Sequence, residues 1–452
     1  MNLNLQAKVR AYFTEGNKRS IIAKKNIVIT FLLKGFSILI GFILIPVTIN
    51  YVNPTQYGIW LTLSSIISWF SYFDIGLANG LKNKLAETNA LNKLDISKTY
   101  VSTTYAILAI ISSVIFIFFW GINHFLDWGI ILHTSDRFNN LKDAALLLIG
   151  IFCTQFVVQI INTVLTACHE VAKVSLIVLL GQIFSLVVLY IFTNITSGSL
   201  IKLIAIIAGV PLLVQLFLSI YYYKTKYAAF SPNFSFVNFK YARNLLILGG
   251  SFFFIQIGSL ILFQTDNIII AQLFHPQEVT VFNIAFKLFS AITMVFTIIM
   301  TPFWTAFTDA YVRNEMHWIK KVIRKMRLFW IILCVCSILL FTISPILYKV
   351  WLHGRVQVPM ALSFVMSIYV MGYSWIMLHC YLLNGIGKIK LQVYMYLVSI
   401  LINIPMAIFF GKQFGIAGVT FSNSLIFVVM GILLWIQCNK ILKGNAYGVW
   451  NR

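Results

Sequence analysis

The chain has 452 residues, of which 60% are hydrophobic and 10% are charged. Soluble domains carry about 25% charged and roughly 45–50% apolar residues. This composition therefore excludes a soluble enzyme and an extended nucleic-acid binder. The net charge of +22 is typical of a membrane protein with basic cytoplasmic loops, so we expect no nucleic-acid partner. The expected class is a polytopic membrane protein.

Apolar runs of about 20 residues predict twelve transmembrane helices in an all-α membrane protein. In chain order these spans are 27–50, 57–80, 99–120, 143–167, 174–193, 201–223, 245–272, 279–305, 328–349, 359–385, 391–410 and 414–437. The first run is too long for the apolar core of a cleavable signal sequence, so we expect it to remain as the first span. The basic leader before it is either a surface helix or a solvated tail.

The distribution of Lys and Arg predicts the orientation of these spans. With the N-terminus in the cytoplasm, the inner segments hold 26 of the 34 basic residues and the outer loops hold 6. Basic residues concentrate in cytoplasmic loops. We therefore expect both termini in the cytoplasm.

Two similar turns indicate an internal duplication. Asn53-Pro54 follows the first predicted span, His275-Pro276 follows the seventh, and each leads into a helix with an aromatic residue at the same offset. The chain then divides into six-helix lobes at 1–224 and 225–452, with the basic stretch 224–243 as linker. An even number of spans in each half predicts a parallel pseudo-two-fold along the membrane normal.

Four charged residues lie inside predicted spans, where an unpaired charge costs about 2.5–3.5 kcal/mol at mid-bilayer. Lys34 and Asp74 match in depth near the cytoplasmic side, and Asp266 and Lys287 match near the outer side. Two interpretations stay open. The residues form two ion pairs that lock neighbouring helices, or they line an aqueous cavity and contact an anion or a coupling ion.

Uncharged polar residues supply further candidates. Gln155, Gln159, Asn162 and Thr166 follow a helical spacing that places them on one face. That face either donates hydrogen bonds to neighbouring helices or forms a cavity wall suited to sugar hydroxyls. Asn79 lies beside Asp74 in a segment with a GxxxG spacing at the end of the second span. Isolated positions, namely Gln182, Gln215, Gln256, Gln264, Asn403 and Asn423, are expected to join helices, and His379 to be hydrogen-bonded structure.

Several motifs of catalysis are absent from the sequence. It lacks G-x-x-x-x-G-K-[ST], HExxH and GxSxG, and its six cysteines form no CxxC. We therefore expect a protein that is not an enzyme and has no catalytic residue, metal site or cofactor.

Motifs in both halves resemble the bacterial O-antigen flippases (Wzx-type) in the polysaccharide transporter branch of the multidrug/oligosaccharidyl-lipid/polysaccharide exporter superfamily. The resemblance lies in Lys34-Gly-Phe-Ser, Pro54-x-x-Tyr-Gly-Ile-Trp and Phe73-Asp-Ile-Gly-Leu-Ala-Asn-Gly-Leu of the first half. It continues in Gln264-Thr-Asp-Asn-Ile-Ile-Ile-Ala and Pro302-Phe-Trp-x-Ala-x-x-Asp-Ala of the second half.

The resemblance implies a flippase that moves undecaprenyl-diphosphate-linked oligosaccharide from the cytoplasmic to the periplasmic leaflet of the inner membrane by alternating access. It makes Lys34 and Lys287 candidate diphosphate contacts. Asp74 and Asp266 become candidates for coupling to H⁺ or Na⁺ or for holding those lysines. Membrane lipids and other polysaccharide assembly proteins are the expected partners.

Two alternatives remain from the sequence alone. A drug/cation antiporter of the same superfamily would need an acid-dominated cavity, whereas Lys and Asp balance here. A polytopic glycosyltransferase or polymerase would need a larger outer domain with catalytic acids, whereas the longest outer loop, about 121–142, contains few acids.

The predicted orientation is testable with reporter fusions. Fusions after Tyr51 and after His275 are expected to report an extracytoplasmic location, because the basic loops hold the other side of each span in the cytoplasm. The measurement is paired alkaline phosphatase and fluorescent-protein activity. A cytoplasmic signal at either position would reject the twelve-span scheme.

Overall fold

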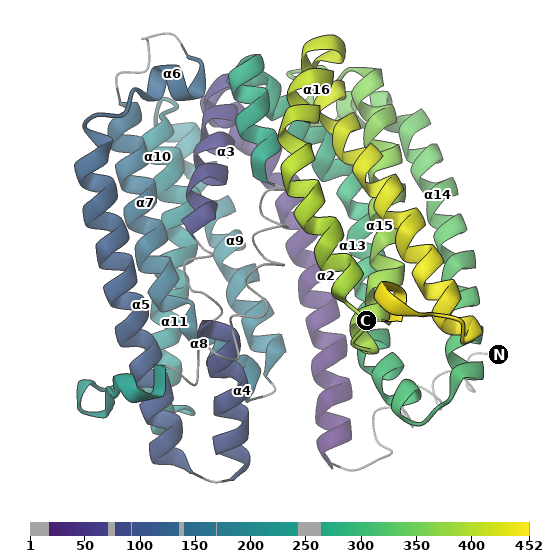
Figure 1. Cartoon of the computed structure of the whole chain (residues 1–452). Helices are drawn as coiled ribbons and strands as arrows, with labels where there is room; N and C mark the ends of the chain where they lie inside the picture. The colour runs from purple at the N-terminus through teal and green to yellow at the C-terminus, as the bar shows by residue number, and fades with distance from the viewer. Residues whose placement is uncertain are drawn as a thin grey trace, which may run out of the picture. The chain divides into compact units, whose positions relative to one another are not determined.

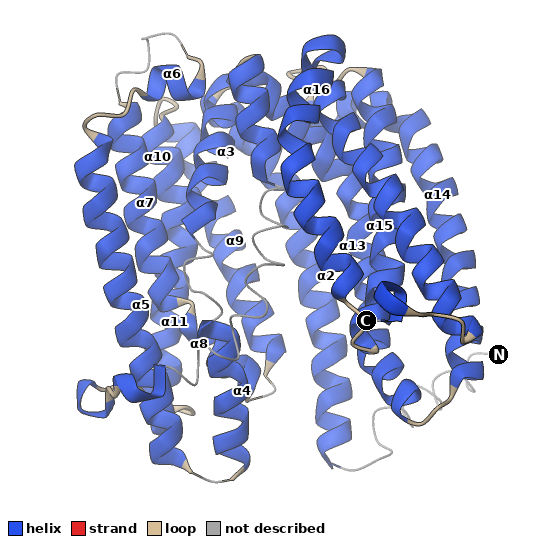
Figure 2. Ribbon diagram, in the orientation of Figure 1, coloured by secondary structure: helices blue, strands red, loops and turns tan. Residues whose placement is uncertain are grey.

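The computed structural model describes residues 18–70, 77–91, 93–134, 140–168, 170–242 and 264–451. Over these residues the chain is helical with connecting loops, and the ribbon contains no strand (Figure 2). Nine of the described helices are long and apolar enough to cross a membrane. The all-helical membrane class is therefore confirmed. Most of the predicted span 245–272 lies outside the described residues, so the number twelve stays a prediction.

The described helices pack into two compact units. The first comprises residues 1–52, 70–126 and 139–253, and the second comprises 53–69, 127–138 and 254–452. The short segments 53–69 and 127–138 thus pack with the second unit although they come early in the chain. The lobe boundaries 1–224 and 225–452 and their pseudo-two-fold stay predictions.

The helices of the first unit come from residues up to 253 and are labelled in Figure 1. They are α2 (Lys18–Val52), α4 (Leu77–Ala90), α5 (Leu94–Asn123), α7 (Leu141–Val158), α8 (Ile160–Ala167), α9 (Val171–Ile195), α10 (Leu200–Ile204) and α11 (Val210–Lys224), with a π turn at Ala205–Gly209 and short 3₁₀ turns at Ala228–Phe230, Phe234–Phe236 and Phe239–Tyr241. Helix α9 packs against α2 and α11, and α5 packs against α7. An apolar cluster that includes Leu81, Val101, Phe156 and Val164 is buried where α4, α5, α7 and α8 meet.

The second unit is organised around α15 (Met360–Gly385), which packs against α13 (Pro276–Val312), α14 (Met316–Leu352) and α16 (Lys390–Lys443). It also contains α3 (Pro54–Ser68), α6 (Trp128–Leu132), a helical segment at 264–273 and a 3₁₀ turn at Gly448–Asn451. More than half of the residues of α15 are buried, because α15 has neighbours on three sides. Among their apolar neighbours, the buried serines of α15 need hydrogen-bond partners. They find them within the unit, as Ser367 Oγ does with Ser337 Oγ at 3.0 Å.

Local sequence accounts for several helix ends. Asn53 precedes α3 and its side-chain oxygen accepts a hydrogen bond from the Gln56 amide at 2.9 Å, with Pro54 as the first helical residue. Asp127 caps α6 in the same way, accepting from the Ile130 amide at 3.2 Å. Side-chain oxygens satisfy amides that have no partner inside the helix. Gly444 ends α16 in the left-handed conformation that favours glycine.

Helix α16 reverses within its 54 residues. Gly415 has φ 65° and ψ −154°, a conformation outside the helical region that glycine tolerates. Beyond it, a Cβ on Gly418 would come within 2.0 Å of the Phe410 carbonyl oxygen, so the returning chain passes very close to the first arm. The two arms correspond to the predicted spans 391–410 and 414–437, and the break falls at Gly415 rather than at 411–413.

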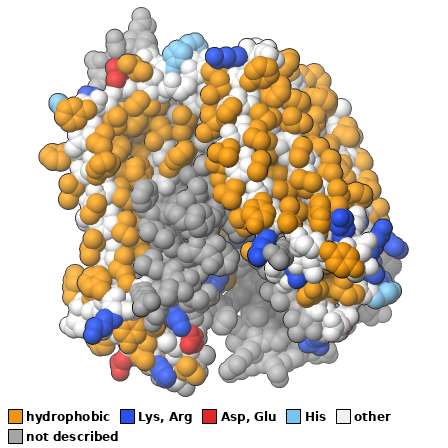
Figure 3. Space-filling model, viewed as in Figure 1, with side chains coloured by type: hydrophobic (Ala, Val, Ile, Leu, Met, Phe, Trp, Pro, Cys, Tyr) orange, Lys and Arg blue, Asp and Glu red, His pale blue; other side chains and the backbone are white. Residues whose placement is uncertain are grey.

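The outer faces of the helices carry the apolar side chains that lipid requires. On α14 these exposed residues run from Leu328 to Val350, and on α5 they include Ile110, Val114 and Phe118. Figure 3 shows such side chains in orange over much of the visible surface. In a soluble protein this exposure would promote aggregation, whereas in a bilayer it matches the hydrocarbon.

The two sequence-related turns meet in the second unit. Thr280 Oγ1 at the start of α13 donates a hydrogen bond to the Pro54 carbonyl oxygen at 2.6 Å. Reciprocally, a Cβ on Gly58 in α3 would come within 1.6 Å of the Pro276 carbonyl oxygen. Pro54 and Gly58 of one turn therefore contact Thr280 and Pro276 of the other, and in the paired turns Pro276 corresponds to Pro54 and Thr280 to Gly58. The two turns thus contact each other through equivalent positions, as in an isologous interface.

The close approach at Gly58 predicts a large effect of a single methyl group. We expect Gly58→Ala to lower the free energy of unfolding by at least about 2 kcal/mol, because the methyl would overlap backbone atoms that have no rotamer to change. The measurement is thermal unfolding of the purified protein in detergent.

Gly35→Ala is the matched control, since Gly35 is also helical and a Cβ there meets no heavy atom within 4 Å. It should be neutral or stabilising by about 0.5–1 kcal/mol, the usual gain on replacing a helical glycine. Equal melting temperatures for the two variants would contradict the packing at Gly58.

Candidate functional site

Among the described carboxylates of the second unit, Asp266 is the most deeply buried, at 3% exposed. Its Oδ2 accepts a hydrogen bond from Asn423 Nδ2 at 2.6 Å. Asn423 Oδ1 in turn accepts from Asn403 Nδ2, and Asn403 Oδ1 accepts from Thr265 Oγ1 at 3.4 Å. Asn403 and Asn423 are both fully buried and lie on opposite arms of α16. The network therefore links segment 264–273 to both arms.

A second polar branch leaves the same segment in another direction. Asn267 Nδ2 donates to Ser65 Oγ of α3 at 2.7 Å, and Asn283 Nδ2 of α13 donates to Asn267 Oδ1 at 2.7 Å. Asn283 also donates to the Val279 carbonyl at 2.8 Å. Segment 264–273 thus has polar attachments to α3 and α13 through Asn267, and to α16 through Asp266.

Asp266 retains one unused oxygen. Oδ1 is buried and accepts no hydrogen bond from the described residues. If the Asp266 carboxylate is ionised, none of the ion pairs among the described residues gives it a positive partner. If Oδ1 carries a proton, that hydroxyl has no acceptor among the described residues. A buried polar group in that state favours binding a proton or a small cation from outside. Carboxylate oxygens are ligands that hard cations accept.

The remaining charged candidates occupy different environments. Lys287 lies on α13 and is half-buried, and the hydrogen-bond partner of Asp266 is Asn423 rather than Lys287. Lys34 lies on α2 with an exposed side chain. Asp74 lies outside the described residues. Asn79 lies in α4, and its side chain also lies outside the described part.

The predicted amide face lies in the first unit. Gln155 of α7 donates to Gln215 Oε1 of α11, which is the interhelical role that the sequence left open. Gln215 is 4% exposed, and its Nε2 lacks a partner among the described residues, as does Asn162 Oδ1. Gln159 stands between the end of α7 and the start of α8. The face therefore combines a helix–helix bond with amide atoms that remain available.

An ion cluster fixes the linker that follows α11. Glu170, at the start of α9, accepts from Lys226 and lies 3.0 Å from Lys173 Nζ. Burial acts to raise the pKa of the Glu170 carboxyl, but hydrogen bonds from Lys226 and Lys173 outweigh it and hold that pKa below its usual value. These ion pairs stabilise the loop.

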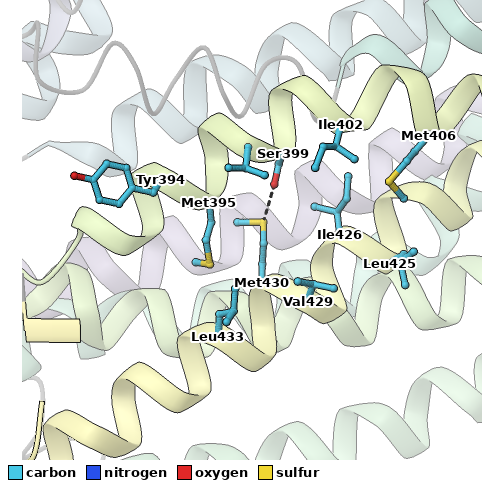
Figure 4. A pocket seen from close by; sticks show the side chains of 11 residues that line it. Tyr394, Met395, Ser399, Ile402, Met406, Leu425, Ile426, Val429, Met430 and Leu433 are labelled. Atoms are coloured by element: carbon cyan, nitrogen blue, oxygen red, sulfur yellow. Dashed lines mark hydrogen bonds between the residues drawn. The ribbon is translucent and has the colours of Figure 1, made fainter. Parts of the chain in front are cut away.

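An apolar groove separates the two arms of α16 (Figure 4). Its volume is about 320 Å³, and its lining includes Met395, Ile402, Met406, Leu425 and Val429. The Ser399 hydroxyl points across it to Met430 Sδ at 3.4 Å. With so few polar atoms the groove suits hydrocarbon rather than a glycan.

A more polar recess of about 480 Å³ lies where α6 meets the start of α13. His133 and His275 line it, with ring centroids 5.2 Å apart, and Glu278 also faces it. His133 Nδ1 bonds the Gln272 carbonyl oxygen at 2.9 Å, and Gln272 Nε2 donates to the Ile130 carbonyl at 3.1 Å. These bonds hold α6 against segment 264–273.

In the sequence Asn403 and Asn423 are isolated positions, and their shared role beside Asp266 was not predicted. A signal was available. The two asparagines lie in the consecutive predicted spans 391–410 and 414–437, whose short connection makes the spans neighbours. The partnership with Asp266 needed the packing of segment 264–273 against the hairpin.

Spanning helices that bury ionisable and amide groups define the class of multi-pass membrane transporters. The family model described as polysaccharide biosynthesis protein matches residues 23–304, which is more than half of the chain. The chain belongs to this family, and its resemblance to the Wzx-type flippases of the exporter superfamily is confirmed.

Relatives in sequence extend over most of the chain. A protein described as an O-antigen export protein of Yersinia pseudotuberculosis is 24% identical over 367 residues, covering 78% of this chain and 81% of the relative. An O-antigen transporter of Salmonella typhi is 22% identical over 392 residues, covering 84% and 87%.

Solved structures share the fold at low identity. An inward-facing multidrug resistance MATE family transporter of the MOP superfamily matches with a TM-score of 0.77 at 12% identity, over 93% of this chain and 98% of that one. The lipid II flippase MurJ, in an inward closed conformation, matches with a TM-score of 0.71 at 12% identity, over 91% and 87%. These likenesses establish the fold alone.

The Asp266 network predicts a stability effect at its donor. We expect Asn423→Ala to lower the free energy of unfolding by about 1–3 kcal/mol, because it leaves Asp266 Oδ2 and an Asn403 donor buried without partners. Thermal unfolding in detergent measures the change. Ser424→Ala is the matched control, since the Ser424 hydroxyl bonds only the Thr420 carbonyl of its own helix. A control variant as unstable as Asn423→Ala would reject the network's role.

Proposed function

We propose that this protein flips an undecaprenyl-diphosphate-linked oligosaccharide, an O-antigen or similar lipopolysaccharide repeat unit, from the cytoplasmic to the periplasmic leaflet of the inner membrane. The observation that carries the proposal is the family match over residues 23–304, joined by O-antigen relatives that cover about four-fifths of the chain. The lipid II flippase shares the fold, so this architecture is compatible with a lipid-linked cargo.

The physical task explains the distribution of polar groups. A glycan and a diphosphate lose their hydration in hydrocarbon, whereas a polyprenyl chain is stable there. A protein that offers amides and charges inside its spans replaces that hydration while the lipid tail stays in the bilayer. Twelve spans in two six-helix lobes, with both termini in the cytoplasm, would expose such groups to each side in turn by alternating access.

Individual residues then take distinct parts. Lys34 and Lys287 bind the diphosphate through charge-assisted hydrogen bonds. Asp266 exchanges a coupling H⁺ or Na⁺ at its unused oxygen, and Asp74 serves as its counterpart near the cytoplasmic side.

Amides contact the sugar hydroxyls in the same scheme, namely Asn79, Gln155, Gln159 and Asn162. Transport itself makes and breaks no covalent bond, so the protein acts without a cofactor and is not an enzyme. Other polysaccharide assembly proteins are its proposed partners.

A drug/cation antiporter is the alternative of the same fold. The MATE likeness, at 12% identity, is a likeness of fold and does not favour drugs as cargo. The sequence relatives favour polysaccharide.

The function is tested in a strain that lacks the gene. Undecaprenyl-linked repeat units should accumulate in the cytoplasmic leaflet while surface polysaccharide is lost, and the wild-type gene should restore the surface glycan. We expect Lys34→Ala and Lys287→Ala to reduce restoration about tenfold or more, because each removes a charged donor to the diphosphate. Surface glycan is normalised to the amount of protein in the membrane.

The variants also separate the two interpretations of the charged residues. If Lys287 only neutralises Asp266, then Lys287→Ala/Asp266→Ala should restore transport, and Lys34→Ala/Asp74→Ala should do so for the other pair. Lys349→Ala is the matched control, because it removes an exposed lysine near the C-terminal end of α14. Full transport by both double variants would reject the diphosphate contacts, and normal surface glycan in the deletion strain would reject the function.

A further inference from the structure

Helix α14 changes character abruptly at Arg327. Its first turns expose Lys320, Lys321, Arg324 and Lys325. From Leu328 to Ile346 the exposed residues are apolar apart from Thr342. A basic segment followed directly by an apolar stripe marks the level at which a spanning helix leaves the headgroup region. Arg327 therefore lies at the boundary between headgroups and hydrocarbon.

Arg327 turns inward from this boundary, toward α15 and α16. Its Nη2 donates to Asn439 Oδ1 at 2.9 Å and lies 3.4 Å from His379 Nε2. The guanidinium carbon lies 5.9 Å from the centre of the Trp375 ring. An amide oxygen, an imidazole nitrogen and an indole face thus surround the cation.

His379 acts as a neutral acceptor in this arrangement. It is fully buried, and its Nδ1 lies 2.8 Å from the Trp375 carbonyl oxygen, which only a protonated Nδ1 can use. A neutral imidazole with its proton on Nδ1 presents the lone pair of Nε2 to Arg327. The three neighbours therefore orient the guanidinium without neutralising it.

The charge of Arg327 remains uncompensated within the described residues. None of their ion pairs includes Arg327, and its Nε is buried without an acceptor. Guanidinium groups held away from water are usually paired with an anion. Their planar fork of donors matches phosphate oxygens, which bind such a fork through two parallel hydrogen bonds.

We infer that Arg327, oriented by Asn439, His379 and Trp375, binds the phosphate of an anionic phospholipid from the surrounding leaflet. The exposed basic residues at 320–325 supply the attraction that concentrates anionic lipid at this surface. The apolar residues that follow, beginning with Leu328, Ile331 and Ile332, offer contact for its acyl chains. In Figure 3, basic side chains gather toward the lower end of this unit and the apolar surface begins beside them.

This site does not depend on the identity of the cargo. It uses α14, α15 and α16 at residues that the flippase proposal does not assign, so it stands whether the cargo is a glycan or a drug. A lipid held there would clamp three helices of the second unit together.

The experiment titrates the purified full chain, in phosphatidylcholine nanodiscs, with phosphatidylglycerol and records thermal stability. The wild type should gain stability in a saturable manner. Arg327→Gln should need about tenfold more phosphatidylglycerol, because it loses charge-assisted hydrogen bonds to the phosphate. Arg324→Gln is the matched control, since it removes the same charge from an exposed neighbour, and should shift the midpoint by no more than about twofold.

Two further measurements identify the ligand. Inorganic phosphate at matched concentration should leave stability unchanged, because it lacks the acyl chains; an equal response to free phosphate would overturn the assignment to a lipid. Arg327→Lys keeps the charge but lacks the fork, and should weaken binding severalfold. If Arg327→Gln does not fold, Arg327→Lys decides the question. Affinity equal to wild type in either Arg327 variant, or equal losses in Arg327→Gln and Arg324→Gln, would overturn the proposal.

Discussion

Hydrocarbon supplies no hydrogen bonds, and this constraint governs the whole molecule. The described spans form helices, in which the backbone groups hydrogen-bond to one another. They also turn apolar side chains outward, as α14 does at positions between Leu328 and Val350. Every polar side chain inside a span must then find a partner in the protein or bind something that enters. In α15 the serines find partners, whereas Asp266 Oδ1 and Gln215 Nε2 do not among the described residues.

The unpartnered Asp266 Oδ1 lies in a segment that is otherwise held by several hydrogen bonds. Segment 264–273 bonds to α3 through Asn267 and to both arms of α16 through Asp266 and Asn423. A ligand at Asp266 would therefore act on three elements at once. A change in that carboxylate's charge alters the hydrogen bond from Asn423, and Asn423 is bonded to the other arm through Asn403. Under the proposed coupling at Asp266, this connection would let a bound ion bias the helix arrangement.

The two polar regions differ in a way that suits different tasks. Around Asp266 the groups are small, close and almost fully buried, which suits a proton or a monatomic cation. The amide face at Gln155, Gln215 and Asn162 carries longer side chains with free donors and acceptors, which suits hydroxyl groups. The groove between the arms of α16 has almost no polar lining and suits hydrocarbon. Under the proposed function, these three regions would serve the coupling ion, the sugar part of the cargo and its lipid part.

The sequence by itself determined the membrane class, the positions of the described spans and the hairpin at 391–437, because hydrophobicity over about 20 residues is a local property. It also identified the paired turns at Pro54 and Pro276 and singled out Asp266. Only the tertiary structure decided what those residues contact. Depth along a helix suggested Lys287 as the partner of Asp266, but depth leaves the helix rotation free, and the packing of α16 brought Asn423 there instead. Arg327 was one basic residue among six in its segment until α15 and α16 surrounded it with neutral acceptors, since which face a helix buries depends on its neighbours.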